Sequence, residues 1–202
     1  MSPHASNPVN ADGDVVDVPR LVQLAKNGDE AAFGELMQAY YTRVYGLLNG
    51  IVRHEDDARD LSQHVWVKVW HKLDSFKGDS DFYTWLYRVA TFAGLDFVRK
   101  RKRQREVELS EALEPNRDAD SVLPPSLTSR PDSAAQTAEI QTVFERALET
   151  LSPEHRTALM LREVEGLSYD EIAVATGCRR GTVMSRIFYA RKSIQAQLKD
   201  VR

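Results

Sequence analysis

Residues 168–192, SYDEIAVATGCRRGTVMSRIFYARK, decide the fold of the C-terminal part of the chain. Ser168 and, three residues later, Glu171 form a capping-box pattern, which predicts the start of a short helix. Gly177 is expected to end this helix, because glycine tolerates a positive φ. A second helix should start around Arg180 and bury, at helical spacing, Val183, Ile187, Ala190 and Ile194. Two helices joined by a glycine turn predict a helix-turn-helix.

The exposed side of the second helix is predicted to be basic and polar, with no acid. One arginine can donate two hydrogen bonds to the edge of a guanine, and cations can contact phosphates. A helical hairpin with a solvated basic face is the alternative, but the spacing and the charge segregation coincide, which favours DNA recognition. The residues expected to contact DNA here are Arg179, Arg180, Thr182, Ser185, Arg186, Tyr189, Arg191 and Lys192.

Composition and charge set the outer limits. The 202 residues, 42% of them hydrophobic, suit one large domain or two small ones with packed cores. The net charge of −3 is unevenly distributed: residues 1–19 carry −3, 20–105 carry +4, 106–138 carry −5 and 139–202 carry +1. Basic blocks joined by acidic connectors are compatible with a nucleic-acid partner.

Several function classes are disfavoured. A single cysteine, Cys178, excludes an internal disulfide and suits a reducing compartment. No apolar run reaches membrane-spanning length and the N-terminus lacks a signal-peptide core, so we expect a cytoplasmic protein. The sequence has no phosphate loop, no HxE…CxxC pattern and no paired carboxylates with histidine, which argues against a nuclease or deaminase. We expect no catalytic residues, metal, cofactor or small-molecule substrate.

The N-terminal half is predicted to be helical after a disordered tail, residues 1–19. A break at Asn27-Gly28-Asp29 separates the first two helices, with Asp29 as N-cap. A third helix is expected over residues 55–73. Its apolar stripe is wider than one core face needs, since Trp66 and Trp70 extend it. Tryptophan on such a helix belongs either to the core or to a partner interface.

Residues 76–105, FKGDSDFYTWLYRVATFAGLDFVRKRKRQR, combine a polar-aromatic loop with a basic run. Aromatic side chains can stack on unpaired bases while cations contact the phosphates of the nucleic-acid backbone. This combination of residues favours binding of single-stranded nucleic acid. The alternative is an aromatic core with a solvated basic tail, and it is the better interpretation of Trp85, Leu86 and Val89.

Residues 106–138 are proline-rich and acidic, which predicts a flexible linker. Beyond them, helices are expected over residues 140–151 and from Ser152-Pro153 to about Glu165. The predicted fold is therefore all-α: two small helical domains, residues 20–105 and 139–202, joined by a flexible acidic linker, with the helix-turn-helix in the second.

Four blocks, in this order, resemble the bacterial extracytoplasmic-function (ECF) sigma factors of the sigma-70 superfamily. They are DARDLSQHVWVKVWHKLDSF, KGDSDFYTWLYRVA, LSPEHRTALMLREVEGLSYDEIA and GTVMSRIFYARKSI. The likeness covers roughly residues 20–105 and 139–198. It implies a non-enzymatic RNA polymerase factor that recognises the −35 element with its helix-turn-helix and opens the −10 element with its first domain.

The resemblance also implies partners and residues. Core RNA polymerase would be bound through a coiled coil of its largest subunit and through its flap region, and an anti-sigma factor would regulate the chain. The residues expected to contact polymerase are Asp57, Asp60, Leu61, Gln63, His64 and Trp66. Those expected at the −10 element and the duplex upstream of it are Lys77, Asp79, Ser80, Phe82, Tyr83, Trp85, Arg88, Arg99, Lys100, Lys102 and Arg103.

This sequence departs from the family pattern at three positions. His64 stands where an acid commonly follows the DLSQ motif, and Met184 and Tyr189 stand where relatives are often basic. A stand-alone helix-turn-helix regulator is the other candidate function, although it leaves the aromatic-basic block without a role.

The two promoter elements lie about 70 Å apart. A coil averaging about 30 Å cannot hold two domains at that separation, so we expect the isolated protein to bind promoters weakly.

Overall fold

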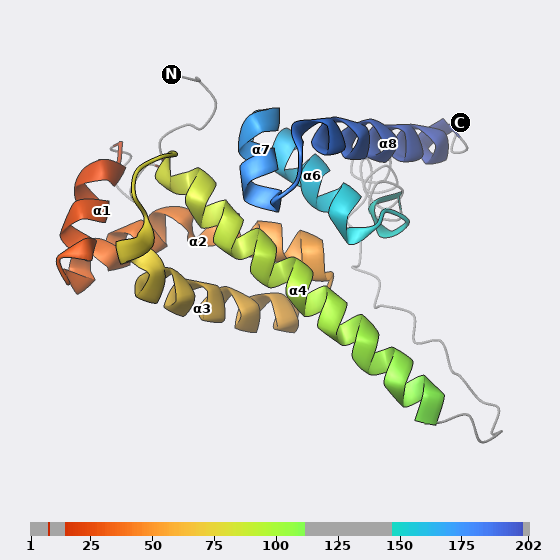
Figure 1. Ribbon diagram of the computed structural model, residues 1–202, viewed down its shortest axis with the longest axis horizontal. Coiled ribbons are helices and arrows are strands. Elements are labelled where there is room, and N and C mark those ends of the chain that lie inside the picture. Colours follow the sequence, from red (N-terminus) through yellow and green to blue (C-terminus); the bar gives the residue numbers. More distant parts are fainter. Residues whose placement is uncertain (1–7, 9–14, 112–146, 200–202) are drawn as a thin grey trace, which may run out of the picture.

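The computed structural model describes residue 8 and residues 15–111 and 147–199 (Figure 1). The elements in these ranges are helices, as predicted: α1 (Val18–Lys26), α2 (Glu30–Val52), α3 (Glu55–Lys72), the short 3-10 helix η1 (Leu73–Ser75), α4 (Phe82–Glu111), α6 (Pro153–Glu163), α7 (Tyr169–Thr176) and α8 (Arg180–Lys199). The all-α class is therefore confirmed.

Helices α1 to α4 form the first bundle, with α2 packed against α1, α3 and α4. Side-chain caps set where the helices begin. Asp17 accepts a hydrogen bond from the Arg20 amide at 3.2 Å, and Asp29 accepts one from the Ala32 amide at 3.0 Å. Because α1 begins at Val18, it includes residues that the sequence assigned to the tail.

Helices α6, α7 and α8 form the second bundle, and α7 and α8 are the predicted helix-turn-helix. The capping box is present: Glu171 donates its amide to Ser168 Oγ at 3.3 Å and accepts the Ser168 amide at 2.7 Å. Gly177 ends α7 with φ 66°, the left-handed conformation that favours glycine. The predicted apolar side of α8 is confirmed as buried, at Val183, Ile187, Ala190 and Ile194.

The two bundles pack directly against each other, which the sequence did not predict. Helix α7 lies on α4, and α6 lies on α2 (Figure 1). Buried residues of both bundles join one continuous hydrophobic cluster. The described part of the chain is therefore a closed arrangement, whereas the sequence analysis treated the two domains as joined only by a coil.

Two boundaries differ from the expectation, and one expected helix is described only at its end. Helix α4 begins at Phe82, so Phe82 and Tyr83 are helical, and it continues to Glu111, six residues into the predicted linker. The rest of that linker, residues 112–138, lies outside the described residues. So does most of the helix expected over residues 140–151, which is described only from residue 147.

Candidate nucleic-acid interface

The exposed face of α8 carries the cations predicted for DNA recognition. Arg179 and Lys192 are exposed, and Arg180 lies 3.6 Å from Asp170 in an open ion pair. Arg191 is bound to Glu163 of α6, so it is less available than its neighbours. Such exposed ion pairs contribute little to stability and can exchange for phosphate contacts.

The polar members of the same face are also accessible. Thr182, Ser185 and Tyr189 are exposed, while Arg186 is half-buried, with Nη1 3.6 Å from the Cys178 sulfur in the turn. This contact orients the Arg186 guanidinium at the N-terminal part of the helix. The structure therefore brings the eight predicted residues to one helix and its preceding turn.

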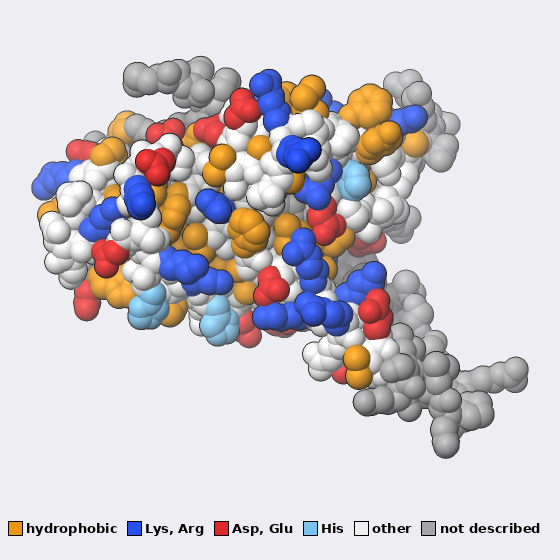
Figure 2. Space-filling model, in the orientation of Figure 1, with side chains coloured by type: hydrophobic (Ala, Val, Ile, Leu, Met, Phe, Trp, Pro, Cys, Tyr) orange, Lys and Arg blue, Asp and Glu red, His pale blue; other side chains and the backbone are white. Residues whose placement is uncertain are grey.

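One exposed aromatic on α8 was missed from the sequence. Phe188 is 62% exposed, and its ring packs edge-on against Tyr189 at 5.4 Å between centroids. Phe188 follows the buried Ile187, so its position one step off the apolar stripe was the available signal. Met184, one helical turn earlier, is 50% exposed. Orange side chains over α8 in Figure 2 show this apolar part of the surface.

The predicted −10 residues divide into an exposed loop and a packed helix start. Lys77 and Asp79 are exposed and Ser80 is half-buried. Phe82 is only 5% exposed, and its ring lies 5.8 Å from those of Tyr40 and Phe76. Phe82 therefore supports the loop from the core, and contact with a partner in this arrangement falls to its neighbours.

Further along α4, Trp85 and Tyr83 are half-buried and Arg88 is exposed. Arg88 lies over the ring of Phe92 at 5.9 Å, and this ring is 43% exposed. Aromatic and cationic side chains thus alternate on the outer side of α4. The sequence placed Trp85 both in the core and at the DNA, and its partial burial is compatible with either role.

The basic run is an exposed strip on the second half of α4, where blue side chains gather in Figure 2. Three of the predicted cations have an acidic neighbour: Arg99 with Glu154 at 3.6 Å, Lys100 with Asp96 at 2.9 Å, and Lys102 with Glu106 at 3.7 Å. Arg103 is exposed. These pairs are solvent-exposed, so phosphates can compete for the same cations.

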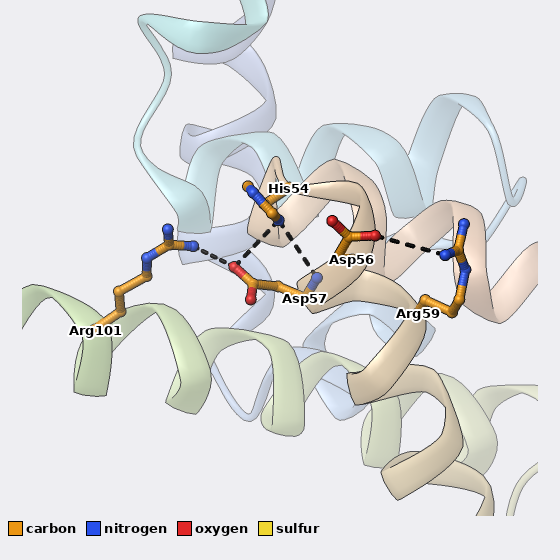
Figure 3. Close-up of polar contacts among 5 residues, drawn as sticks. All are labelled: His54, Asp56, Asp57, Arg59 and Arg101. Carbon is orange, nitrogen blue, oxygen red and sulfur yellow. Dashed lines mark hydrogen bonds and ion pairs between the residues drawn. The ribbon is translucent and has the colours of Figure 1, made fainter. Parts of the chain in front are cut away.

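Arg101 lies within the basic run 99–103 that was expected to hold the upstream duplex, but it faces inward instead. From α4 it points to the N-terminus of α3 and pairs with the Asp57 carboxylate (Figure 3). His54 also flanks this carboxylate, with Nδ1 3.6 Å from Asp57 Oδ2. Asp57, a predicted polymerase contact, is therefore already engaged at the start of α3.

Two of the other predicted polymerase residues, Gln63 and Trp66, line an apolar groove between α2 and α3. Asp60, Gln63 and His64 are exposed and Leu61 is half-buried, whereas Trp66 is only 3% exposed. The groove has a volume of about 560 Å³. It is lined by Glu30, Phe33, Met37, Tyr41, Gln63, Trp66, Val67 and Trp70. Trp66 thus forms part of the buried wall of the groove, and Gln63 lines the groove with an exposed side chain.

Two tyrosine–carboxylate pairs join the bundles, and no pattern in the sequence predicted them. Tyr87 of α4 donates its hydroxyl to Glu165, and Tyr83 donates to Glu171. Burial raises the pKa of Tyr87, and the nearby Glu165 charge adds to the rise. Burial also raises the pKa of Glu165, while its hydrogen bond from Tyr87 and the Arg43 charge act in the opposite direction. A carboxylate from the second bundle therefore lies buried against the first.

Within residues 15–111 and 147–199, no three His, Cys, Asp or Glu side chains converge as a metal site would require. In the same part of the chain, no helix has the length and apolar character needed to cross a bilayer.

Comparison with protein families and known structures relates the geometry to a function. The model of sigma-70 region 2 matches residues 36–104, and that of sigma-70 region 4 matches residues 141–194. The chain is 36% identical over 182 residues to the ECF RNA polymerase sigma-E factor of Escherichia coli K12, covering 90% of this chain and 94% of that one. It is 35% identical over 190 residues to the RNA polymerase sigma-H factor of Pseudomonas aeruginosa, with the same coverage.

Solved structures agree. The sigma factor RpoE of Bartonella quintana, in complex with the anti-sigma factor NepR, matches with a TM-score of 0.60 and 28% identity over 84% of this chain and 98% of that one. CnrH, in complex with the cytosolic domain of CnrY, has a TM-score of 0.62 at 24% identity over 91% and 99%, which supports the fold alone. Matches to both regions, in order, favour the sigma factor over a stand-alone regulator. The chain therefore belongs to the extracytoplasmic-function sigma factors of the sigma-70 family, non-enzymatic factors that direct RNA polymerase to specific promoters and initiate transcription.

Proposed function

We propose that the two bundles divide promoter recognition between them. The face of α8 from Arg179 to Lys192 binds the −35 element in the major groove, with Arg186 and Ser185 near base edges. The loop over residues 76–83 and the start of α4 bind the opened −10 element. The observation that carries this division is the accessible, acid-free side of α8, directly opposite its buried apolar side.

The basic strip of α4 holds the duplex upstream of the −10 element. Arg99, Lys100, Lys102 and Arg103 contact phosphates, because they are exposed and successive along one helix. This contact is independent of base sequence, whereas that of α8 is not. The strip therefore contributes affinity and α8 contributes preference for a promoter.

Core polymerase binds the groove between α2 and α3. Val67 is 57% exposed and Met37 and Tyr41 are each 38% exposed, so an apolar surface is open to a partner beside the exposed Gln63 amide. A helical coiled coil of the largest polymerase subunit is the occupant that the family relationship indicates. The flap region of core polymerase would contact the second bundle.

An anti-sigma factor is the second proposed partner. The related RpoE was solved with the anti-sigma factor NepR, and that chain is matched over 98% of its length. Action on RNA polymerase implies a cytoplasmic location, which we also propose.

The polymerase contact is tested by Gln63→Ala. Gln63 is exposed, so its truncation should leave the fold intact while weakening binding to core polymerase by about 1–4 kcal/mol. The measurement is a titration of core enzyme with labelled full-length protein. Gln23→Ala, the same change on an exposed position of α1, is the matched control and should bind like the wild type. Equal affinity of the two variants would remove Gln63 from the interface.

A further inference from the structure

One arginine of the second bundle is buried without a full set of partners. Arg156, near the start of α6, is 6% exposed. Its Nη2 donates to the Leu151 carbonyl at 3.2 Å, but Nε and Nη1 are buried with no hydrogen-bond partner in the part of the chain that the structure describes. Burial lowers the pKa of Arg156, and the nearby charge of Arg53 adds to this effect. Because a buried cation without an acceptor is unfavourable, the Arg156 guanidinium is available to an anionic ligand.

Arg156 lines a cavity between α2, α6 and α8, which we call the arginine cavity. Its volume is about 360 Å³, within the range of about 300–1,000 Å³ that is typical of small-molecule sites. Much of its wall is apolar and consists of the side chains of Leu148, Leu159, Met160, Val164 and Ile194. The arginine cavity therefore combines an apolar wall with a buried cation, which suits a ligand that is apolar at one end and charged at the other.

The charges around the arginine cavity favour an anion. Its charged lining residues are three arginines and one acid, Glu163. This acid pairs with Arg191, and Arg53 donates to Glu149 at 2.6 Å beside the cavity. Among these described residues, Arg156 is the cation that has no ion pair. A water molecule can accept one of its hydrogen bonds but leaves its charge uncompensated, whereas an anion does both.

We propose that the arginine cavity binds a small amphipathic monocarboxylate, with the carboxylate at Arg156 and an alkyl chain of about ten carbons along the apolar wall. One unpaired guanidinium matches a single negative charge, which favours a carboxylate over a phosphate dianion. The apolar groove between α2 and α3 does not suit this ligand, because its charged lining residue is an acid, Glu30. The carboxylate therefore selects the arginine cavity over the groove.

Methionine side chains report the two cavities separately. Met160 lines the arginine cavity, Met37 lines the groove between α2 and α3, and Met184 is exposed on α8. In the full-length protein labelled with ¹³C at the methionine methyl groups, each gives an NMR signal that a Met→Leu substitution assigns. Titration with decanoate should shift the Met160 signal until the site is saturated and leave those of Met37 and Met184 in place. A titration that moves Met37 but not Met160, or that moves none of the three, would overturn the proposal.

Two further probes separate the contributions of chain length and charge. Octanoate should bind the arginine cavity about fifteenfold more weakly than decanoate, because each buried methylene changes the dissociation constant about fourfold. Decylammonium has the same alkyl chain with the opposite charge, and it should not shift the Met160 signal. Equal shifts of Met160 with decanoate and decylammonium would show that Arg156 does not select the ligand and would overturn the proposal.

The role of Arg156 is tested by Arg156→Met, which removes the charge and keeps an unbranched side chain in the same space. It should weaken decanoate binding by about tenfold or more, since hydrogen bonds to charged groups are the stronger ones. Far-UV circular dichroism and the methionine signals without ligand check the fold. Unchanged decanoate affinity in a folded Arg156→Met would overturn the proposal.

An exposed position provides a second variant that does not disturb the core. Val164 lines the arginine cavity and is 68% exposed, so Val164→Glu should fold normally and weaken decanoate binding about fivefold by charge repulsion. Val174→Glu on α7 is the matched control, because Val174 is 45% exposed and lies outside the cavity lining. If Arg156→Met does not fold, weaker binding in Val164→Glu than in Val174→Glu supports the proposal, and equal binding overturns it.

Discussion

The two DNA-facing helices differ in how much of their binding surface is free. On α8 the proposed contacts are mostly exposed, and Tyr189 is 58% exposed. At the start of α4, Phe82 is 5% exposed and Tyr83 is bonded to the second bundle. The −35 surface is therefore ready to bind in the free protein, whereas the −10 surface is partly engaged within the protein itself.

This difference follows from what each site has to do. A major groove can be recognised by a rigid helix whose side chains point outward. Opened DNA exposes unpaired bases, and aromatic side chains bind such bases by stacking. In the free protein, the same aromatic side chains pack against a nearby apolar surface, because this removes them from water. The α4 surface is thus the one that a partner must uncover.

The largest expected effect contrasts a buried aromatic residue of the −10 set with an exposed one on α8. Phe82→Ala should lower the free energy of unfolding by about 3–5 kcal/mol, because its ring fills the space between Tyr40 and Phe76. Tyr189→Ala, on exposed α8, should change it by less than about 0.5 kcal/mol. Urea unfolding of the two variants measures both. Equal losses would remove the contrast between the two helices.

An effect of intermediate size should separate base contacts from phosphate contacts. Arg186→Ala should cost about 1–3 kcal/mol and relax preference within the −35 element. Lys102→Ala on α4 should weaken binding to all promoters alike and reduce the salt dependence by about one unit. Holoenzyme binding to a set of −35 variants gives both results. A uniform loss for Arg186→Ala would make it a phosphate contact.

The smallest effect concerns the pH dependence of the closed contact. Glu165 faces Tyr87 of α4 and Arg43 of α2, and its burial raises its pKa. If opening exposes this carboxyl, its pKa returns to about 4.3. The added stability of the closed state is then fully present below that value and is lost as pH rises through the raised pKa.

Dyes attached through Lys68→Cys on α3 and Ala196→Cys on α8, in a Cys178→Ser background, report the distance between the bundles. Energy transfer between them should therefore increase on acidification from pH 8 to pH 5. Glu165→Gln, which is neutral at every pH, should remove most of this change. A pH response that persists unaltered in Glu165→Gln would assign it to other groups.

Much of the fold was accessible from the sequence because local signals agreed with it. The capping box at Ser168, the break at Asn27-Gly28-Asp29 and the stripe ending in Ile194 each specify a helix boundary or a buried face by local chemistry. The four sequence blocks, taken in order, indicated the family. These signals act within a few residues of each other, so a single sequence is sufficient to reveal them.

What the sequence could not provide was the contact between distant residues. Tyr87 and Glu165 are 78 positions apart, and neither has a local pattern that marks it as half of a buried pair. Phe82 was assigned to DNA because aromatic side chains serve stacking and core packing equally well, and only its neighbours decide between them. Phe188 was missed although it lies one step off the buried stripe, because an apolar side chain is by default assigned to the core.

The central claim is that promoter opening needs polymerase to separate the two DNA-binding surfaces. Permanganate reactivity of thymines in the −10 element, with and without core enzyme, tests it most directly. We predict no reactivity with the free protein and clear reactivity once core polymerase is added. Strong reactivity with the isolated protein would contradict the account.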